Sequence, residues 1–246
     1  MSLPYVVNWQ AANTSFLGPL QSPTTGVPLL FNNPVTILNP ITNSNVSFLG
    51  AINQGIMPPD NVRTVTLTSS GNLSGIQFTI ISTAENGLVS TQAIAGPNAD
   101  TVSYSTPPAA HVISIIPNGT SSTQLSIGIS NGYTMPFECD VWNKQSLLSF
   151  AITNVVGTVS LTPQITNDKS FIMVRQGNYT PLNRMYFTMV PDQNKSTTST
   201  DAVTIPITAN TIFSFSEFPV SACRLSVGST TTGSFTLTTI MQGGKY

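Results

Sequence analysis

The sequence predicts an all-β protein: two β-sandwich (jelly-roll-like) domains preceded by a proline-rich N-terminal arm. Short segments of alternating apolar and polar residues recur along most of the chain, and no stretch has a convincing helical period. Turn-forming residues separate these segments, among them the dipeptides Asn118-Gly119 and Asn131-Gly132. Alternation that is broken by closely spaced turn signals is typical of an all-β sandwich.

Residues 61–168 are expected to form the first sandwich. Its clearest strand is 63–68, and the turn at 69–72 leads to a second strand at 75–81. The remaining strands of this domain are expected at 88–95, 101–105, 111–116, 124–129, 147–155 and 158–165. Because the chain has 246 residues, it is long enough to bury more than one core.

A smaller sandwich is expected at residues 169–246, with the boundary near residue 168, where the first alternating series ends. Its candidate strands are 170–174, 185–190, 202–207, 211–215, 223–227 and 234–240. The polar run at 192–200 is expected to be a loop between two of these strands.

The first 60 residues are expected to form an arm, because prolines interrupt them repeatedly. These prolines are Pro4, Pro19, Pro23, Pro28, Pro34, Pro40, Pro58 and Pro59. A proline confines a strand to a sheet edge or a bulge, so the apolar clusters between them should pack on the arm's own domain or on a neighbouring subunit. The candidate partner-binding residues are Tyr5, Trp9, Phe16, Leu29, Leu30 and Phe31.

The composition indicates a surface that associates with other proteins. Charged residues make up 7% of the chain, against about 25% in an average protein, and the formal net charge is −1. Roughly two residues in five are Ser, Thr, Asn or Gln. β-Branched and aromatic residues are plentiful, which argues against disorder. A nearly neutral surface tends to associate, and interface cores are depleted of charge, so we expect neighbouring subunits to cover much of it.

Charge and hydropathy patterns also limit the partners. The eight lysines and arginines are scattered and form no basic patch, so no nucleic acid is expected to bind. No apolar run approaches the ~18 residues of a membrane-spanning helix. The first ten residues, MSLPYVVNWQ, lack the basic and apolar regions of a secretory signal, which predicts synthesis in a cytoplasm.

We expect no catalytic centre, cofactor or metal. The single histidine, His111, lies in an alternating apolar segment and is interpreted as an ordinary strand residue. Cys139 and Cys223 are far apart in the sequence and are interpreted as small buried residues, although their pairing stays open. One histidine and two distant cysteines do not make a standard zinc site.

Two further stretches could carry chemistry. Glu138 and Asp140 would share one face of a strand, as a glycosidase pair requires, but a solvated edge or loop is the preferred interpretation. A calcium site that uses one or more of the nine acidic residues stays open, although no Asp-x-Asp-x-Asp loop is present. The segment Gly96-Pro97-Asn98 lacks the lysine and the glycine spacing of a phosphate-binding loop, so it is expected to be a turn.

Several phrases resemble a module of structural proteins from tailed bacteriophages. They are RTVTLTSSGNLSGIQFTII, VSTQAIAGPNADTVSYST and VISIIPNGTSSTQLSIGI, followed by MPFECDVWN, VVGTVSLTPQITNDK and, more weakly, SACRLSVGSTTTGSFTLTTIMQGG. The resemblance covers about residues 62–169 and 219–244. It implies a non-enzymatic virion component, either a head decoration protein or part of the tail or head–tail region, assembled in the host bacterial cytoplasm.

The resemblance also implies the partners, which are other copies of the chain and other virion proteins of the capsid or tail. The copy number stays open, and a trimer, a hexameric ring and attachment to a lattice all fit. The alternative is a receptor- or glycan-binding module of a tail fibre, which would bind a glycan of the host surface. A polysaccharide depolymerase is a third hypothesis, and it rests only on Glu138 and Asp140.

Overall fold

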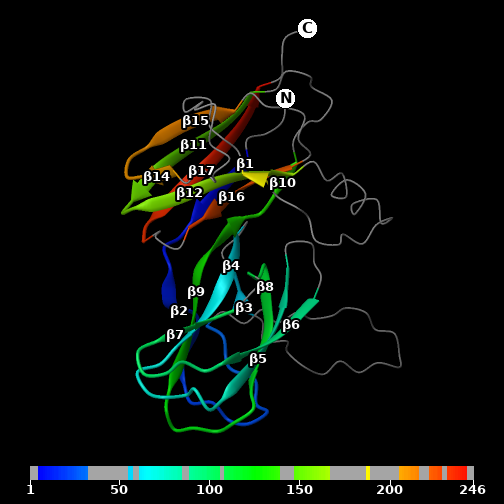
Figure 1. Cartoon of the computed structure of the whole chain (residues 1–246), viewed down its shortest axis with the longest axis vertical. Coiled ribbons are helices and arrows are strands. Elements are labelled where there is room, and N and C mark those ends of the chain that lie inside the picture. The colour runs from blue at the N-terminus through cyan, green and yellow to red at the C-terminus, as the bar shows by residue number, and fades with distance from the viewer. Residues whose placement is uncertain are drawn as a thin grey trace, which may run out of the picture. The chain divides into compact units, whose positions relative to one another are not determined.

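The fold is all-β in the part of the chain that the structure describes. A computed structural model describes residues 5–32, 55–57, 61–84, 89–105, 108–138, 147–166, 187–188, 205–215, 222–228 and 232–242. Every regular element in these ranges is a strand (Figure 1), which confirms the expected all-β class for them. Over these same ranges, no helix has the length and hydrophobicity needed to cross a membrane.

The chain divides into two compact units. Unit 1 consists of Met1–Ala11, Pro58–Asn61 and Asn131–Tyr246, and unit 2 consists of Ala12–Met57 and Val62–Ser130. This division cuts across the expected ranges 1–60, 61–168 and 169–246. The physical reason is that strands distant in the sequence pair with one another, so an expected boundary near residue 168 falls inside unit 1.

Unit 2 contains two four-stranded groups of strands. One has the order β2 (Asn13–Gln21), β9 (Leu125–Thr134), β4 (Asn61–Thr68) and β7 (Val102–Tyr104). The other has the order β3 (Gly55–Ile56), β8 (His111–Pro117), β5 (Gln77–Thr83) and β6 (Val89–Ala95). These eight strands pair in a nested order, and every pair is antiparallel: β2 pairs with β9, β3 with β8, β4 with β7 and β5 with β6.

The core of unit 2 is built by the inward residues of both groups of strands. On β5, Phe78 and Ile80 are buried while their neighbours are more exposed, as period-two alternation requires. Val65 on β4 and Ile127 on β9 come from the other group and belong to the same cluster. Burial of such apolar side chains is the main source of stability for a folded unit.

Unit 1 contains one four-stranded sheet and a second set of strands around β12. The sheet has the order β1 (Tyr5–Trp9), β17 (Ser234–Gln242), β11 (Leu147–Val156) and β15 (Thr211–Phe215). The second set comprises β12 (Val159–Thr166), β16 (Ala222–Val227), β10 (Phe137–Glu138), β13 (Phe187–Thr188), β14 (Ile205–Ile207) and the end of β9. Both contribute to one core, in which Trp9, Phe150 and Leu225 are buried.

Most of the strands expected from alternation are present. All eight strands expected between residues 61 and 168 correspond to described strands, and the expected strands 211–215, 223–227 and 234–240 correspond to β15, β16 and β17. The expected strand 170–174 lies outside the described residues. The predicted turn at Asn131-Gly132 is wrong, because both residues continue β9, where Gly132 pairs with Val227 of β16.

Within the described parts of the expected N-terminal arm, residues 5–9, 13–21 and 55–56 form strands of the two units. β1 pairs with β17 over its whole length, from Tyr5 opposite Thr239 to Trp9 opposite Phe235. The rings of Trp9 and Phe235 stack with centroids 6.0 Å apart. β2 pairs with β9, with register shifts along its length. Residues 33–54 of the expected arm lie outside the described residues.

Trp9→Ala is therefore expected to lower the free energy of unfolding by about 3–5 kcal/mol, because it removes a large buried ring from the core of unit 1. Denaturant unfolding followed by circular dichroism measures this loss. Val6→Ala is the matched control on the same strand, since Val6 is 47% exposed, and it should cost well under about 1 kcal/mol. Equal costs for the two variants would contradict the placement of β1 in the core.

Candidate interaction surface

The segment that precedes residue 33 is held as an extended chain along unit 2. The N–H of Leu29 donates to the carbonyl of Ile115 on β8 (2.9 Å), and the N–H of Asn32 donates to the carbonyl of Leu17 on β2 (2.8 Å). An extended chain presents successive side chains to opposite sides. Accordingly Leu29 and Phe31 are buried in the core of unit 2, whereas Leu30 is 59% exposed.

The side chain of Gln21 fixes the outward position of Leu30. Its amide nitrogen donates to the carbonyl of Leu30 (2.9 Å), and its amide oxygen accepts from the N–H of Leu30 (2.7 Å). One side chain thus replaces the two hydrogen bonds that a neighbouring strand would supply. Leu20, which precedes Gln21 on β2, is 61% exposed, so unit 2 exposes two large apolar side chains, Leu20 and Leu30, in these segments.

The six expected partner-binding residues therefore have different environments. Trp9, Leu29 and Phe31 are buried within their own units, and this burial explains their apolar character without a partner. Phe16 is half-buried against the core of unit 2. Leu30 is exposed, and the backbone of Tyr5 lies in β1, while its side chain is outside the described part of the structure. Among the candidates whose side chains the structure describes, only Leu30 combines the expected chemistry with a large exposed area.

A second surface lies on unit 1, on the side of the four-stranded sheet that faces away from the core. We call it the outer face, and we define it by Val6, Asn8, Ala151, Ile212, Thr236 and Thr238, all of which are at least partly exposed. The strand register places Val6 opposite Thr238, Thr238 opposite Ala151, and Ala151 opposite Ile212, so these four form one row across the sheet. Both ends of the row are large and apolar, with Val6 47% and Ile212 64% exposed.

Polar residues of the outer face are hydrogen-bonded to one another. The hydroxyl of Thr236 donates to Oδ1 of Asn8 (3.1 Å), and Nδ2 of Asn154 donates to the same hydroxyl (3.3 Å). None of the residues that define the outer face is charged. An uncharged surface of this kind can contact another protein without desolvating an ion, which would be costly.

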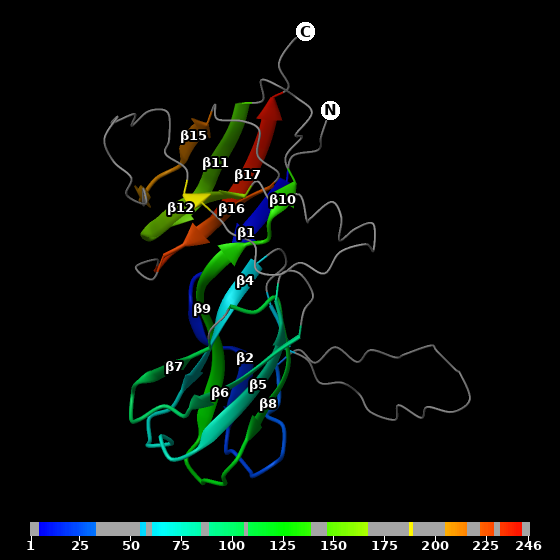
Figure 2. The same ribbon diagram turned by 45° about the vertical axis from the view of Figure 1, so that its right-hand side comes forward.

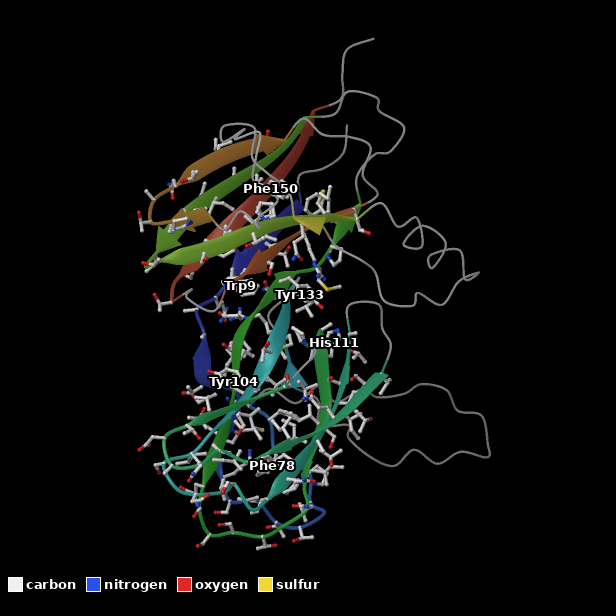
Figure 3. The ribbon with its side chains drawn as sticks, in the orientation of Figure 1. Trp9, Phe78, Tyr104, His111, Tyr133 and Phe150 are labelled. Atoms are coloured by element: carbon white, nitrogen blue, oxygen red, sulfur yellow. The ribbon has the colours of Figure 1, made fainter. Side chains whose placement is uncertain are left out.

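The stretch that begins at Gly96 is more than the expected turn, because it packs tightly on residues 69–73. The carbonyl of Pro97 accepts from the N–H of Leu73 (2.8 Å), and the N–H of Asp100 donates to the carbonyl of Ser69 (2.9 Å). Figure 3 labels Phe78, whose ring would lie 2.8 Å from a Cβ added at Gly96, and the carbonyl of Leu73 would lie 2.4 Å from it. The glycine is therefore required by close packing and not by chemistry.

Arg63 is the most deeply buried charged residue that the structure describes. Its Nε donates to the carbonyl of Ser130, and its backbone exchanges hydrogen bonds with Ala109 (2.8 Å each). Desolvation by burial lowers the pKa of Arg63 to about 9, so the guanidinium stays protonated at neutral pH. The alternating pattern of β4 indicates this burial, because Arg63 falls on the same face of the strand as Val65 and Leu67. The pattern does not indicate that Arg63 bonds to β9, since that contact depends on tertiary structure.

The residues considered for catalysis or metal binding are not gathered into a site by the described part of the chain. His111 lies exposed at the start of β8, and Cys223 is buried in the core of unit 1 (Figure 3 labels His111). The backbone of Glu138 lies in β10, whereas its side chain, Cys139 and Asp140 are outside the described residues. Within the described ranges, no three His, Cys, Asp or Glu side chains come close enough to hold a metal ion.

Comparisons with known proteins give no match: no family model, no curated protein and no solved structure is similar to this chain.

Gly96→Ala is expected to destabilise unit 2 by about 2–4 kcal/mol, because the new Cβ must displace the backbone of Leu73 or the ring of Phe78. Thermal and denaturant unfolding measure this change. Gly75→Ala is the matched control, since an added Cβ there meets nothing within 4 Å, and it should be neutral or slightly stabilising. If Gly96→Ala were as harmless as Gly75→Ala, the close packing described here would be wrong.

Proposed function

We propose that the chain is a non-enzymatic structural component of a bacteriophage particle, which decorates or cements the capsid or forms part of the tail or head–tail region. The observation that carries this proposal is the uncharged surface: charged residues are 7% of the chain, and the outer face of unit 1 has none. Such a surface is poorly suited to remain fully solvated and well suited to be covered by neighbouring subunits.

The strand pairing of unit 2 supports the proposal. Eight strands in two groups of four, with the first paired to the last and each inner pair nested within it, are what a jelly roll requires. We therefore propose that unit 2 is a jelly roll and that unit 1 is a β-sandwich. Jelly rolls occur in viral capsid proteins and also in lectins. The first three phrases that resemble phage proteins, residues 63–81, 89–106 and 112–129, all belong to unit 2.

Assembly would proceed by contacts between uncharged surfaces. Exposed apolar residues such as Leu30 and Ile212 would lose their contact with water, and sheet surfaces would pack on neighbouring subunits. A stable protein interface buries about 1,600 Å² in total, so several interfaces per subunit would give a particle that dissociates slowly. Since few ions take part, association should depend little on ionic strength.

Sedimentation velocity of the purified full-length chain tests this proposal. We expect a defined oligomer, or binding to phage capsids or tails, with the same sedimentation coefficient at about 0.05 M and about 0.5 M salt. A chain that stays monomeric at all concentrations and binds no particle would contradict the proposal. So would an oligomer that dissociates in high salt, because charge would then hold it together.

The alternative, a receptor- or glycan-binding module of a tail fibre, shares the expected fold, because lectins also use jelly rolls. A glycan array probed with the full-length chain discriminates between the two. Specific glycan binding by a chain that neither self-associates nor binds particles favours the alternative. Self-association without glycan binding favours the structural role.

A further inference from the structure

The outer edge of β6 in unit 2 is a regular strand edge that no described strand covers. β6 is the last strand of the order β3-β8-β5-β6, of which Figure 2 labels β8, β5 and β6, and it pairs with β5 residue by residue, from Gln77 opposite Ala95 to Thr83 opposite Val89. A strand at the end of a sheet presents one row of N–H and C=O groups away from its partner. For β6, the residues that present this row follow from the hydrogen bonds around it.

Four residues of β6 direct their backbone groups outward. Gly96, directly after β6, donates its N–H to the carbonyl of Ile76, directly before β5 (2.8 Å). Gln77, the first residue of β5, bonds on the opposite side, toward β8. Its carbonyl accepts from the N–H of Asn118 (2.9 Å), and its N–H donates to Oδ1 of Asn118 (2.8 Å). In an antiparallel pair, alternate residues face the same neighbour. The residues that face β5 are therefore Ser90, Gln92 and Ile94, and those that direct N–H and C=O away from it are Val89, Thr91, Ala93 and Ala95.

Three features that usually prevent strand pairing between molecules, namely charges, prolines and bulges, are absent from the residues of β6 itself. The sequence of β6, VSTQAIA, has no charged residue and no proline, and its register with β5 has no bulge. The other described edges of unit 2 are less suitable: β3 has 2 residues and β7 has 3, while β2 contains Pro19 and register shifts. The side chains of Val89, Thr91, Ala93 and Ala95 are all exposed.

We propose that β6 pairs antiparallel with β6 of a second copy of the chain, which joins two four-stranded sheets into one. A two-fold axis at Gln92 places Thr91 of one copy opposite Ala93 of the other, and Val89 opposite Ala95, so that every outward backbone group meets a partner. These pairs set β-branched side chains against small ones and bring no charges together. The net charge of −1 adds little repulsion between copies.

This inference rests on the proposed function, since it names one surface through which a structural subunit would associate. A second copy is favoured over a different protein because self-pairing places Val89 opposite Ala95 and Thr91 opposite Ala93, so that no charges are opposed and each β-branched side chain meets a small one. β-Strand addition by an unrelated partner would use the same backbone groups and is an outcome that the test can detect.

Ala93→Pro in the full-length chain tests the proposal. It removes an N–H that points away from β5, so the pairing within the subunit is kept, and proline is tolerated on an edge strand whose N–H faces solvent. Sedimentation velocity over about 1–100 μM should show dimers of the wild type and a dissociation constant raised at least about tenfold in the variant. The unfolding midpoint of the variant should stay close to that of the wild type.

A charge-swap experiment keeps the proposal falsifiable if Ala93→Pro fails to fold. Ala93→Lys and Ala93→Glu should each weaken self-association, and a mixture of the two should form mixed dimers, which native mass spectrometry identifies. Thr14→Lys is the matched control, because it adds the same charge on an exposed residue of β2, and it should dimerise like the wild type.

Three results would overturn the inference. The first is a wild type that is monomeric over the whole concentration range. The second is a folded Ala93→Pro variant that associates like the wild type. The third is that mixed dimers of the Ala93→Lys and Ala93→Glu variants form no more readily than dimers of either variant alone. An oligomer that survives Ala93→Pro, or a monomer that binds particles, refutes pairing through β6 and leaves the structural role in place. A monomer that binds no particle refutes both.

Discussion

Hydrogen bonding between strands that are far apart in the sequence is the constraint on which the rest of this structure depends. β1 pairs with β17, which joins the two ends of the chain in one sheet, and β2 pairs with β9 across more than a hundred residues. Because few charged groups are present, ion pairs contribute little, and the apolar cores form only where these pairings bring two layers of strands together. Each unit is therefore made of segments that are separate in the sequence.

The same constraint decides which surfaces remain for association. A sheet that pairs its inner strands fully still ends in edge strands and leaves one face in water. In unit 1 that face carries Val6 and Ile212 at the ends of one row, and in unit 2 the regular edge is β6. Both surfaces are uncharged, so a single physical property, the scarcity of charge, connects the composition to the proposed role in assembly.

Local structure could be predicted from the sequence more completely than tertiary structure. Alternation of apolar and polar residues in the sequence located β4, β5 and β8. Of these three, β5 is half-buried with an unbroken period of two, whereas β4 is buried on both faces. It could not predict that Asn131-Gly132 continues a strand, because pairing with β16 overrides the turn preference of that dipeptide. Nor could it predict the burial of Trp9, Leu29 and Phe31 within their own units, since a proline-interrupted segment does not reveal which strands will pair with it. The candidate surfaces depend on register, which only the structure provides.

Residue-specific amide hydrogen exchange of β6, measured at low and at high protein concentration, tests the central claim most directly. The amides of Ser90, Gln92 and Ile94 should be protected at both concentrations, because they bond to β5. Those of Val89, Thr91, Ala93 and Ala95 should exchange quickly at low concentration and become protected as the chain assembles. Rapid exchange of these four amides in the assembled protein would contradict association through this edge.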